Sequence, residues 1–428
     1  MFLFVYVVVL VCSGPVAHQL FHFSFQVHEE ESEETCRSWF SVKFSGEDSE
    51  GRFADGLGRV DCEGNRYVAS VTFPAPGNYE LELGRLQVLC KDSEPRPVLE
   101  AGRNKASLQL TVLSSVVGVN TEPAPPSHRC TLRDLESAKI GSYYQVGACK
   151  LPDCEGTPRE SYWGWPGLVW RPHHCHLRYY DAEELVTRLQ GKTVMFLGDS
   201  TMDEAVEGFL MLAGVEEQSV LATMSVDWNY TDFTGQILVR NLHRHRLIEA
   251  DFVLHDLHVL HRFTGHSDLD SNALGTATFN TTEFLDYFFS HFGPEALHPP
   301  DLVVFNSGRH DSFSSVGEQT DKMDWLAGHM TELAAKVNTK LLWRSSNVAN
   351  TLVWDMINDR TAMVMRRHGI PVVDVSGPGL FREKDDRLSM TDGVHFGFTA
   401  ISHGAKYLDG HEAMTQILLQ GIFDTLGV

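Results

Sequence analysis

The three residue types needed for serine-based acyl transfer occur in two short motifs of this chain. Gly198-Asp199-Ser200 directly follows the apolar run 194–197, and Asp392 and His395 lie three residues apart near the C-terminus. A serine hydroxyl becomes a strong nucleophile when a nearby imidazole removes its proton and a carboxylate holds that imidazole in the required tautomer. Each motif alone is common by chance, but together they supply all three groups.

The segments around Ser200 favour a position at the end of a β-strand. An apolar strand is expected over 193–197, and residues 201–207 have the acidic first turn and apolar spacing of a helix. The hydroxyl would then lie at the carboxyl end of a strand and beside a helix N-terminus, where open α/β sheets bind ligands. A Gly-x-Ser-x-Gly pentapeptide is absent, with Met202 in place of the second glycine, which disfavours an ordinary α/β-hydrolase.

The composition is typical of a globular protein with more than one domain. The chain has 428 residues, 43% hydrophobic and 21% charged, and two domains are expected for this length. Its formal net charge of −22 opposes association with a nucleic acid or an anionic membrane surface. A neutral or cationic substrate fits this charge better.

The N-terminus has the pattern of a signal peptide. Residues 2–12 form an apolar run followed by small residues, and the run is shorter than the ~18 residues that cross a bilayer. We therefore assign residues 1–17 to a signal peptide, with cleavage after Ser13, Gly14 or Ala17. The mature chain is expected to have no stable membrane insertion and to be secreted or held in the lumen of the Golgi or secretory pathway.

Cysteine and asparagine usage agrees with this route. Asn229 and Asn280 stand in N-glycosylation triplets. After the signal peptide, all the cysteines precede the Ser200 motif, which indicates disulfides in that part of the chain. Their odd number leaves one thiol free or intermolecular, and their connectivity stays open. They are Cys36, Cys62, Cys90, Cys130, Cys149, Cys154 and Cys175.

The chain divides into an all-β part and an α/β part. Residues 18–118 show short alternating strands separated by Gly, Pro and Asp, which predicts an immunoglobulin- or filamin-like β-sandwich. Residues 119–180 comprise a proline-rich linker and a Cys- and Trp-rich segment. Residues 181–428 alternate helices with β-branched strands, which predicts a mostly parallel sheet with helices on both faces. Helices are expected over 182–189, 323–337, 353–367 and 412–425, and strands over 193–197, 301–305, 340–343 and 370–375.

Four segments of the chain resemble the SGNH (GDSL-like) hydrolases, and more narrowly the PC-esterase group. Residues 168–182 resemble the Trp-Arg-Pro-x-x-Cys-x-Leu and Asp-Ala motifs of that group, and residues 189–201 its Leu-x-Gly-Lys, strand and Gly-Asp-Ser sequence. Residues 306–310 resemble its Asn-x-Gly-His block, with Arg309 inserted before the histidine, and residues 343–346 its Arg-Thr-Ser strand end. The group includes the plant trichome-birefringence-like O-acetyltransferases and the neurexophilin-and-PC-esterase proteins. The end block lacks the Trp and Cys that follow in the plant proteins, so the acceptor chemistry of the plant enzymes is not assumed for this chain.

The resemblance implies a three-layer, flavodoxin-like α/β domain and a role for each motif residue. Ser200 would be the nucleophile, His395 the general base and then acid, and Asp392 its orienting partner. The oxyanion hole would comprise the Ser200 N–H, the Asn306 side chain and a glycine N–H, for which Gly235 is the candidate. Asn306 equally fits a turn residue at a strand end. Cys175 is assigned to a disulfide, and substrate contacts are expected from Asp199, Gly308, Arg309 and Arg344.

The function expected is that of an acyl esterase or O-acetyltransferase, with acetyl as the expected acyl group, acting on glycan hydroxyls through an acyl-enzyme on Ser200. The alternative is a non-catalytic secreted protein, a glycan-binding module or a ligand, that retains the fold. No cofactor and no metal are expected. His255, His258 and His261 have a spacing that a metal could use, but residues three apart on a strand point to opposite faces.

Overall fold

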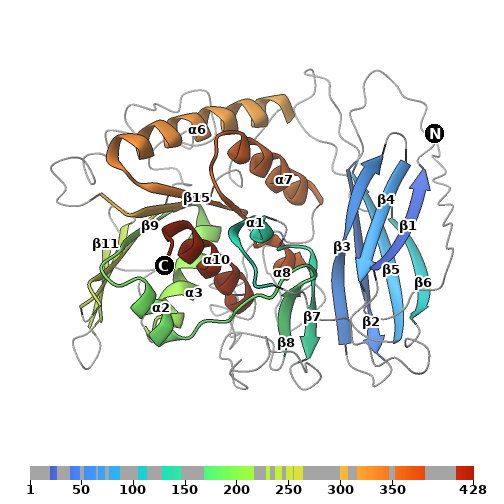
Figure 1. Cartoon of the computed structure of the whole chain (residues 1–428), viewed down its shortest axis with the longest axis horizontal. Helices are drawn as coiled ribbons and strands as arrows, with labels where there is room; N and C mark the ends of the chain where they lie inside the picture. The colour runs from blue at the N-terminus through green and yellow to red at the C-terminus, as the bar shows by residue number, and fades with distance from the viewer. Residues whose placement is uncertain are drawn as a thin grey trace.

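The structure is a computed structural model, and its α/β part is built on one continuous sheet (Figure 1). Within that sheet, five neighbouring strands are parallel: β13 (Leu257–Phe263), β9 (Thr193–Gly198), β14 (Leu302–Phe305), β15 (Lys340–Arg344) and β16 (Val372–Val373). Numbered along the chain, their spatial order is 2-1-3-4-5, which is the flavodoxin-like order. The mostly parallel sheet predicted for this part of the chain is confirmed. The residues that the structure describes are 20–26, 39–48, 53–63, 66–72, 77–86, 105–112, 128–136, 138–145, 168–215, 228–231, 237–242, 247–253, 255–263, 299–306, 316–346, 352–380 and 411–428.

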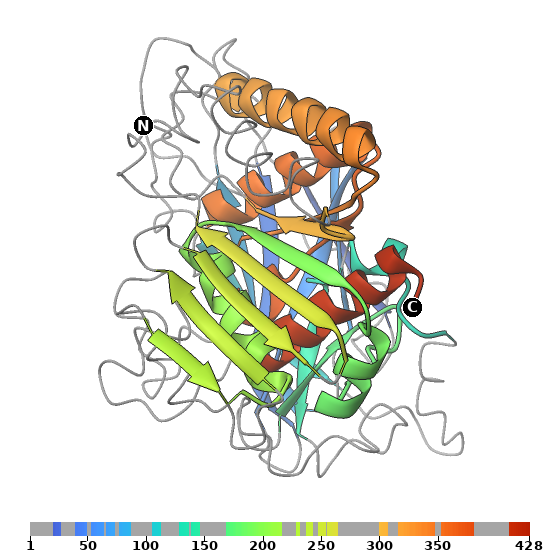
Figure 2. The same ribbon diagram turned by 90° about the vertical axis from the view of Figure 1, so that its left-hand side faces the viewer.

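Helices cover both faces of this sheet, so the domain has three layers. On β9, Val194 and Phe196 face one side and Met195 and Leu197 the other, as the two-residue period of a strand requires. The first side packs against α2 (Ala182–Arg188), α3 (Ser200–Leu212) and α10 (His411–Leu426), and the second against α6 (Val316–Val337) and α7 (Leu352–Arg367). Figure 1 shows α6 and α7 above β15 and α10 below it, and in Figure 2 α10 runs behind the strands.

Three strands that the sequence patterns did not predict extend the sheet on one side. β10 (Trp228–Thr231), β11 (Ile237–Leu242) and β12 (Leu247–Phe252) pair in antiparallel fashion, and β12 pairs with β13. They come between β9 and β13 along the chain. The other differences are at element ends: α6 begins at Val316, before the predicted 323, and β16 is shorter than the predicted 370–375.

The N-terminal part is antiparallel β-structure. Its strands are β1 (Leu20–Gln26), β2 (Trp39–Asp48), β3 (Phe53–Glu63), β4 (Arg66–Thr72), β5 (Gly77–Leu86) and β6 (Lys105–Val112). They lie in the order β1-β4-β3-β2-β5-β6, and β3 pairs with β2 through its first half and with β4 through its second half. The predicted β-structure is thus confirmed, while its assignment to an immunoglobulin- or filamin-like sandwich stays a prediction.

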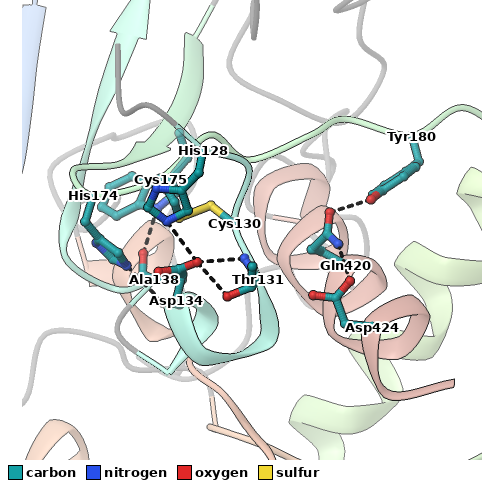
Figure 3. Close-up of a disulfide and its surroundings, with 11 residues drawn as sticks. His128, Cys130, Thr131, Asp134, Ala138, His174, Cys175, Tyr180, Gln420 and Asp424 are labelled. Carbon is teal, nitrogen blue, oxygen red and sulfur yellow. Dashed lines mark hydrogen bonds and ion pairs between the residues drawn. A yellow bond between two sulfur atoms is a disulfide. The ribbon is translucent and has the colours of Figure 1, made fainter. Parts of the chain in front are cut away.

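The segment between the two parts is fastened to the α/β domain (Figure 3). Helix α1 (Leu132–Leu135) follows Cys130, and the hairpin of β7 (Gly141–Gln145) and β8 (Leu168–Pro172) comes next along the chain. The disulfide Cys130–Cys175 closes the segment after this hairpin. The disulfide predicted for Cys175 by family resemblance is therefore confirmed. Further along, the Gln416 side chain in α10 accepts from the Tyr180 N–H at 2.7 Å and donates to the Tyr180 carbonyl at 2.9 Å.

No helix among the described residues is long and apolar enough to cross a membrane.

Candidate active site

Ser200 is the first residue of α3 and lies two residues after Gly198, the carboxyl end of β9. Asp199 is the N-cap of this helix, and its Oδ1 accepts hydrogen bonds from the Thr201 N–H at 2.9 Å and the Thr201 hydroxyl at 2.8 Å. The first N–H groups of a helix have no intrahelical partner and carry the positive end of the helix dipole. A helix start of this kind favours an anionic ligand, and the role of the Ser200 N–H as an oxyanion donor stays a prediction.

Asn306 connects this helix start to the neighbouring strand β14. Its Oδ1 accepts from the Asp199 N–H at 3.2 Å, while its Nδ2 donates to Asp199 Oδ1 at 3.2 Å and to Thr201 Oγ1 at 2.8 Å. Asn306 is 3% exposed, and both hydrogens of its amide have acceptors. The side chain thus braces the turn that carries Ser200, as a strand-end residue does. Its role as an oxyanion donor stays a prediction. To donate to an oxyanion, Nδ2 would have to give up its hydrogen bond to Asp199 or to Thr201.

Gly198 is needed at this turn because of a close approach. A Cβ at residue 198 would lie 1.8 Å from Asn306 Oδ1 and 2.8 Å from Met202 Cβ. Any larger residue would therefore displace either Asn306 or the first turn of α3. The motif has a glycine at this position because the absence of a side chain lets the Asn306 amide contact the backbone of residue 199.

Strand order places this turn where an α/β sheet binds ligands. β9 pairs with β13 on one side and β14 on the other, so the chain leaves β9 at the point where the strand order reverses. A crevice forms at the carboxyl ends of the strands at such a switch point. Ser200 and Asn306 follow the two strands that flank it, which is the arrangement expected for a site built around Ser200.

Arg344 ends β15 and is 1% exposed. Burial lowers the pKa of its guanidinium to about 10, while the nearby carboxylates of Glu204 and Asp199 raise it. At neutral pH the side chain is therefore charged, and it offsets the charge of two buried carboxylates at the start of α3, 1% and 3% exposed. This environment is that of a structural cation; the substrate contact predicted for Arg344 stays a prediction.

The other predicted site residues are outside what the structure describes. Asp392, His395, Gly235, Gly308, Arg309 and Asn280 are not among the described residues, and of Ser200 and Asn229 only the backbone is described, in α3 and β10. The triad therefore stays a prediction. Of the predicted residues, the structure brings Asp199, the Ser200 backbone and Asn306 together, with Arg344 within electrostatic reach of Asp199.

Sequence patterns missed two residues of this network. Thr201 bonds to both Asp199 and Asn306, and its position directly after the motif serine was the only available signal. Glu204 is a fully buried carboxylate one turn further along α3, and it reads in sequence as an ordinary helical acid. The two histidines of β13 behave as the strand period predicts: His258 is exposed and His261 is 2% exposed. In the part of the chain that the structure describes, no group of three or more His, Cys, Asp or Glu residues is close enough to hold a metal ion.

Both the motifs and the strand order resemble those of the SGNH/GDSL-type esterases, including the PC-esterase and trichome-birefringence-like group. In sequence, the chain is 27% identical over 139 residues to Protein YLS7 of Arabidopsis thaliana, a match that covers 29% of this chain and 27% of the relative. It is 31% identical over 76 residues to Protein trichome birefringence-like 18 of the same plant, covering 17% of this chain and 14% of the relative. The matched segments thus span less than a third of these relatives, and no family model matches the chain.

Solved structures similar to this one include several esterases. The α/β hydrolase LAE5 from the metagenome of Lake Arreo matches with a TM-score of 0.30 and 15% identity, covering 56% of this chain and 96% of that protein. The acetylxylan esterase Axe2 of Geobacillus stearothermophilus matches with a TM-score of 0.29 and 12% identity, covering 56% and 97%. A GDSL-like lipase from Bacteroides thetaiotaomicron matches with a TM-score of 0.27 and 15% identity, covering 54% and 88%.

Proposed function

We propose that this protein transfers an acyl group, most simply acetyl, to or from a glycan hydroxyl through an acyl-enzyme on Ser200. The observation that carries the proposal is the position of Ser200. It is the first residue of a helix, it follows the strand at the switch point of a flavodoxin-like sheet, and the hydrogen bonds of Asp199, Thr201 and Asn306 hold that turn in place.

The proposed mechanism uses groups of this chain alone. Ser200 Oγ attacks the ester carbonyl while His395 takes the hydroxyl proton, and Asp392 orients the imidazole and stabilises its charged form. The Ser200 N–H at the start of α3, with the Gly235 N–H and the Asn306 amide, stabilises the oxyanion. Loss of one such fixed donor costs about 3 kcal/mol of transition-state stabilisation. His395 returns the proton to the leaving alcohol, and water or a sugar hydroxyl then attacks the acyl-enzyme.

The glycan substrate is supported by the resemblance and by the charge of the chain. The curated relatives include a trichome birefringence-like protein, and the resemblance to the PC-esterase group implies O-acetyl chemistry on glycan hydroxyls. The net charge of −22 and the two N-glycosylation triplets agree with a neutral sugar substrate met in the secretory pathway. We further propose that residues 18–118 form an immunoglobulin- or filamin-like sandwich, since β3 divides its pairing between β2 and β4 as strands that pass between two sheets do.

One observation favours the alternative of a non-catalytic glycan-binding protein. Both amide hydrogens of Asn306 are bonded within the protein, which is what a purely structural asparagine requires. Such a protein would bind glycan equally well with and without the Ser200 hydroxyl.

Turnover of a chromogenic acetyl ester by the purified mature protein tests the proposal. We expect release of acetate by the wild type and its loss in Ser200→Ala, with Ser45→Ala in strand β2 of the N-terminal β-structure as the control serine. Adding a deacetylated polysaccharide separates the two reactions, because a transferase moves the acetyl group to the sugar and an esterase to water. Equal acetate release by the wild type and Ser200→Ala would overturn the assignment.

A further inference from the structure

The hydroxyl of Thr201 lies between two other polar side chains at the turn that carries Ser200. Thr201 Oγ1 donates to Asp199 Oδ1 at 2.8 Å and accepts from Asn306 Nδ2 at 2.8 Å. The Thr201 side chain is fully buried, and Asp199 and Asn306 are each 3% exposed. Solvent therefore offers no replacement for either bond, and the three side chains depend on one another for their hydrogen bonds.

The direction of these two bonds follows from the donors and acceptors that are present. An ionised aspartate has only acceptors, so the proton of the Thr201 hydroxyl points to Asp199. The hydroxyl oxygen can then only accept from Asn306, which requires the NH2 group of the amide on this side. The Asn306 Oδ1 is correspondingly turned to the Asp199 N–H. Turning the amide over would place oxygen against oxygen at Thr201 and NH2 against N–H at Asp199, so only one orientation fits all these contacts.

Thr201 also supplies most of the hydrogen bonds that the Asp199 side chain receives. Its N–H and its hydroxyl both donate to Asp199 Oδ1, and Asn306 Nδ2 adds a longer bond of 3.2 Å. Asp199 Oδ2 has no hydrogen-bond partner among the described residues. If Asn306 withdrew its hydrogen from Asp199, Oδ1 would keep two donors, and the amide would stay bound to Thr201 at 2.8 Å. The amide hydrogen that bonds to Asp199 is thus the one that can be released at the lower cost.

We propose that Thr201 is a positioning residue of the acyl-transfer site: its hydroxyl fixes the orientation of the Asn306 amide and holds one amide hydrogen, so that the other can turn to the oxyanion. The inference rests on the proposed function, in which Asn306 is an oxyanion donor. Thr201 acts through Asn306 and does not touch the substrate. This role lets Asn306 brace the turn and stabilise the oxyanion with the same amide.

Removing the Thr201 hydroxyl tests this role. Thr201→Val keeps the shape of the side chain without its donor and acceptor, whereas Thr201→Ser keeps both. We expect kcat for the chromogenic acetyl ester to fall roughly tenfold to a hundredfold in Thr201→Val, because a misaligned amide stabilises the oxyanion poorly. KM should change by less than about twofold, since no substrate contact is removed. Thr201→Ser should restore kcat to within about threefold of the wild type. Thr201→Ala, which adds no methyl group beside Asp199, repeats the test if the valine variant does not fold.

Thr415→Val in α10 is the matched control. Thr415 is 3% exposed, and within the described part of the chain its hydroxyl has no hydrogen-bond partner. The substitution therefore makes the same chemical change at another buried helical threonine without breaking a hydrogen bond. We expect it to leave kcat, KM and the urea midpoint of unfolding at their wild-type values.

A double-mutant cycle shows whether Thr201 acts through Asn306. In the Asn306→Ala background, Thr201→Val should lower kcat by less than about twofold, because no amide remains to be oriented. The same cycle measured by urea unfolding reports the contact between the two side chains without any need for activity. We expect the two losses of unfolding free energy to be smaller together than their sum.

The outcomes distinguish this inference from the proposed function. If the wild type does not turn over the ester, the proposed function fails, and additive losses in the unfolding cycle would overturn the contact of Thr201 with Asn306. If the wild type is active, a wild-type kcat in Thr201→Val or Thr201→Ala shows that the hydroxyl does not position the amide. A loss of kcat that is equally large with and without the Asn306 amide, or equal in Thr201→Ser and Thr201→Val, would contradict the inference as well.

Discussion

Gly198 and Asn306 define the site at the scale of single residues. The amide of Asn306 bonds to the backbone and side chain of Asp199 and to the hydroxyl of Thr201, and this contact is possible because residue 198 has no side chain. The geometry of the nucleophile turn therefore depends on one missing Cβ and one amide. The effects of replacing Gly198 and of replacing Asn306 can be measured separately.

We predict that Gly198→Ala destabilises the protein and slows the reaction. The added methyl must displace Asn306 or Met202, and overpacking of this kind costs about 1–3 kcal/mol. Thermal unfolding and acetyl-ester turnover measure the two effects. Gly328→Ala in α6 is the matched control, because the nearest atom to its Cβ, His368 Cε1, is at the ordinary contact distance of 3.6 Å. Alanine there should leave activity intact and raise stability by about 0.5–1 kcal/mol.

Replacing Asn306 distinguishes a brace from an oxyanion donor. If Asn306 holds the turn, Asn306→Ala loses about 1–3 kcal/mol of unfolding free energy, because buried groups of Asp199 lose their hydrogen-bond partner. A donor that acts only in the transition state would lower kcat and leave the unfolding free energy unchanged. Urea unfolding beside steady-state kinetics gives both quantities, and we expect both to fall.

At the scale of elements, the disulfide Cys130–Cys175 and helix α1 attach the Cys- and Trp-rich segment to the domain. The bond closes a loop with a sequence separation of 45 residues, and α1 begins with a capping box in which Asp134 accepts from the Thr131 N–H at 2.8 Å and the Thr131 hydroxyl at 2.7 Å (Figure 3). The turn that carries Lys139 follows directly, and Lys139 forms ion pairs with an aspartate of α7 and with the aspartate that follows β16. This segment is therefore part of the scaffold of the sheet edge and more than a linker.

We predict that replacing both Cys130 and Cys175 by serine lowers stability by about 2–4 kcal/mol, because the unfolded chain regains the freedom that the cross-link removes. Thermal unfolding under non-reducing conditions measures the loss. Asn78→Ser, in strand β5, serves as a control for a substitution remote from this bond. An unchanged Tm in the double variant would mean that the disulfide does not hold this segment.

Patterns in the sequence predicted the elements that have a continuous apolar run or a periodic apolar face. They missed the strands that are held mainly by hydrogen-bond pairing with their neighbours. β9, β14 and β15 are continuous apolar runs, and α7 and α10 have clear apolar faces, so their positions were predicted to within a few residues. β3 contains Asp55, Gly56 and Gly58, which disfavour strands, yet pairing with β2 holds these residues extended. The first turns of α6 carry few apolar residues, so periodicity gave no signal for them.

At the scale of the whole molecule, topology explains how the site forms from distant segments. Strand pairing brings Asp199 and Asn306 into contact across 107 residues of chain, and the family motifs indicated these residues but not their hydrogen bonds. The ion pairs of Lys139 with Asp355, Asp359 and Asp374 have no sequence signature, because these residues come from three separate segments and the spacing of ordinary charged residues carries no information. The motifs therefore indicated that Asp199 and Asn306 belong to the site, whereas their hydrogen bonds are known only from the packed structure.

One prediction at this scale concerns the cleavage and glycosylation of the chain. We expect the protein expressed in secretory cells to reach the medium or the Golgi lumen with its N-terminus after residue 13, 14 or 17, and with glycans on Asn229 and Asn280. N-terminal sequencing and the mobility shift after glycosidase treatment measure this. Asn229→Gln and Asn280→Gln should each remove one step of that shift. Retention of Met1 on a cytosolic product would contradict the secretory assignment.

The central claim is that the hydroxyl of Ser200 is activated by the imidazole of His395. Labelling the purified protein with a fluorophosphonate, digesting it and locating the adduct by mass spectrometry tests this directly. We predict one adduct, on Ser200, and its loss in His395→Ala without a change in Tm. An adduct on another residue, or labelling of Ser200 that is equally fast without His395, would contradict the account.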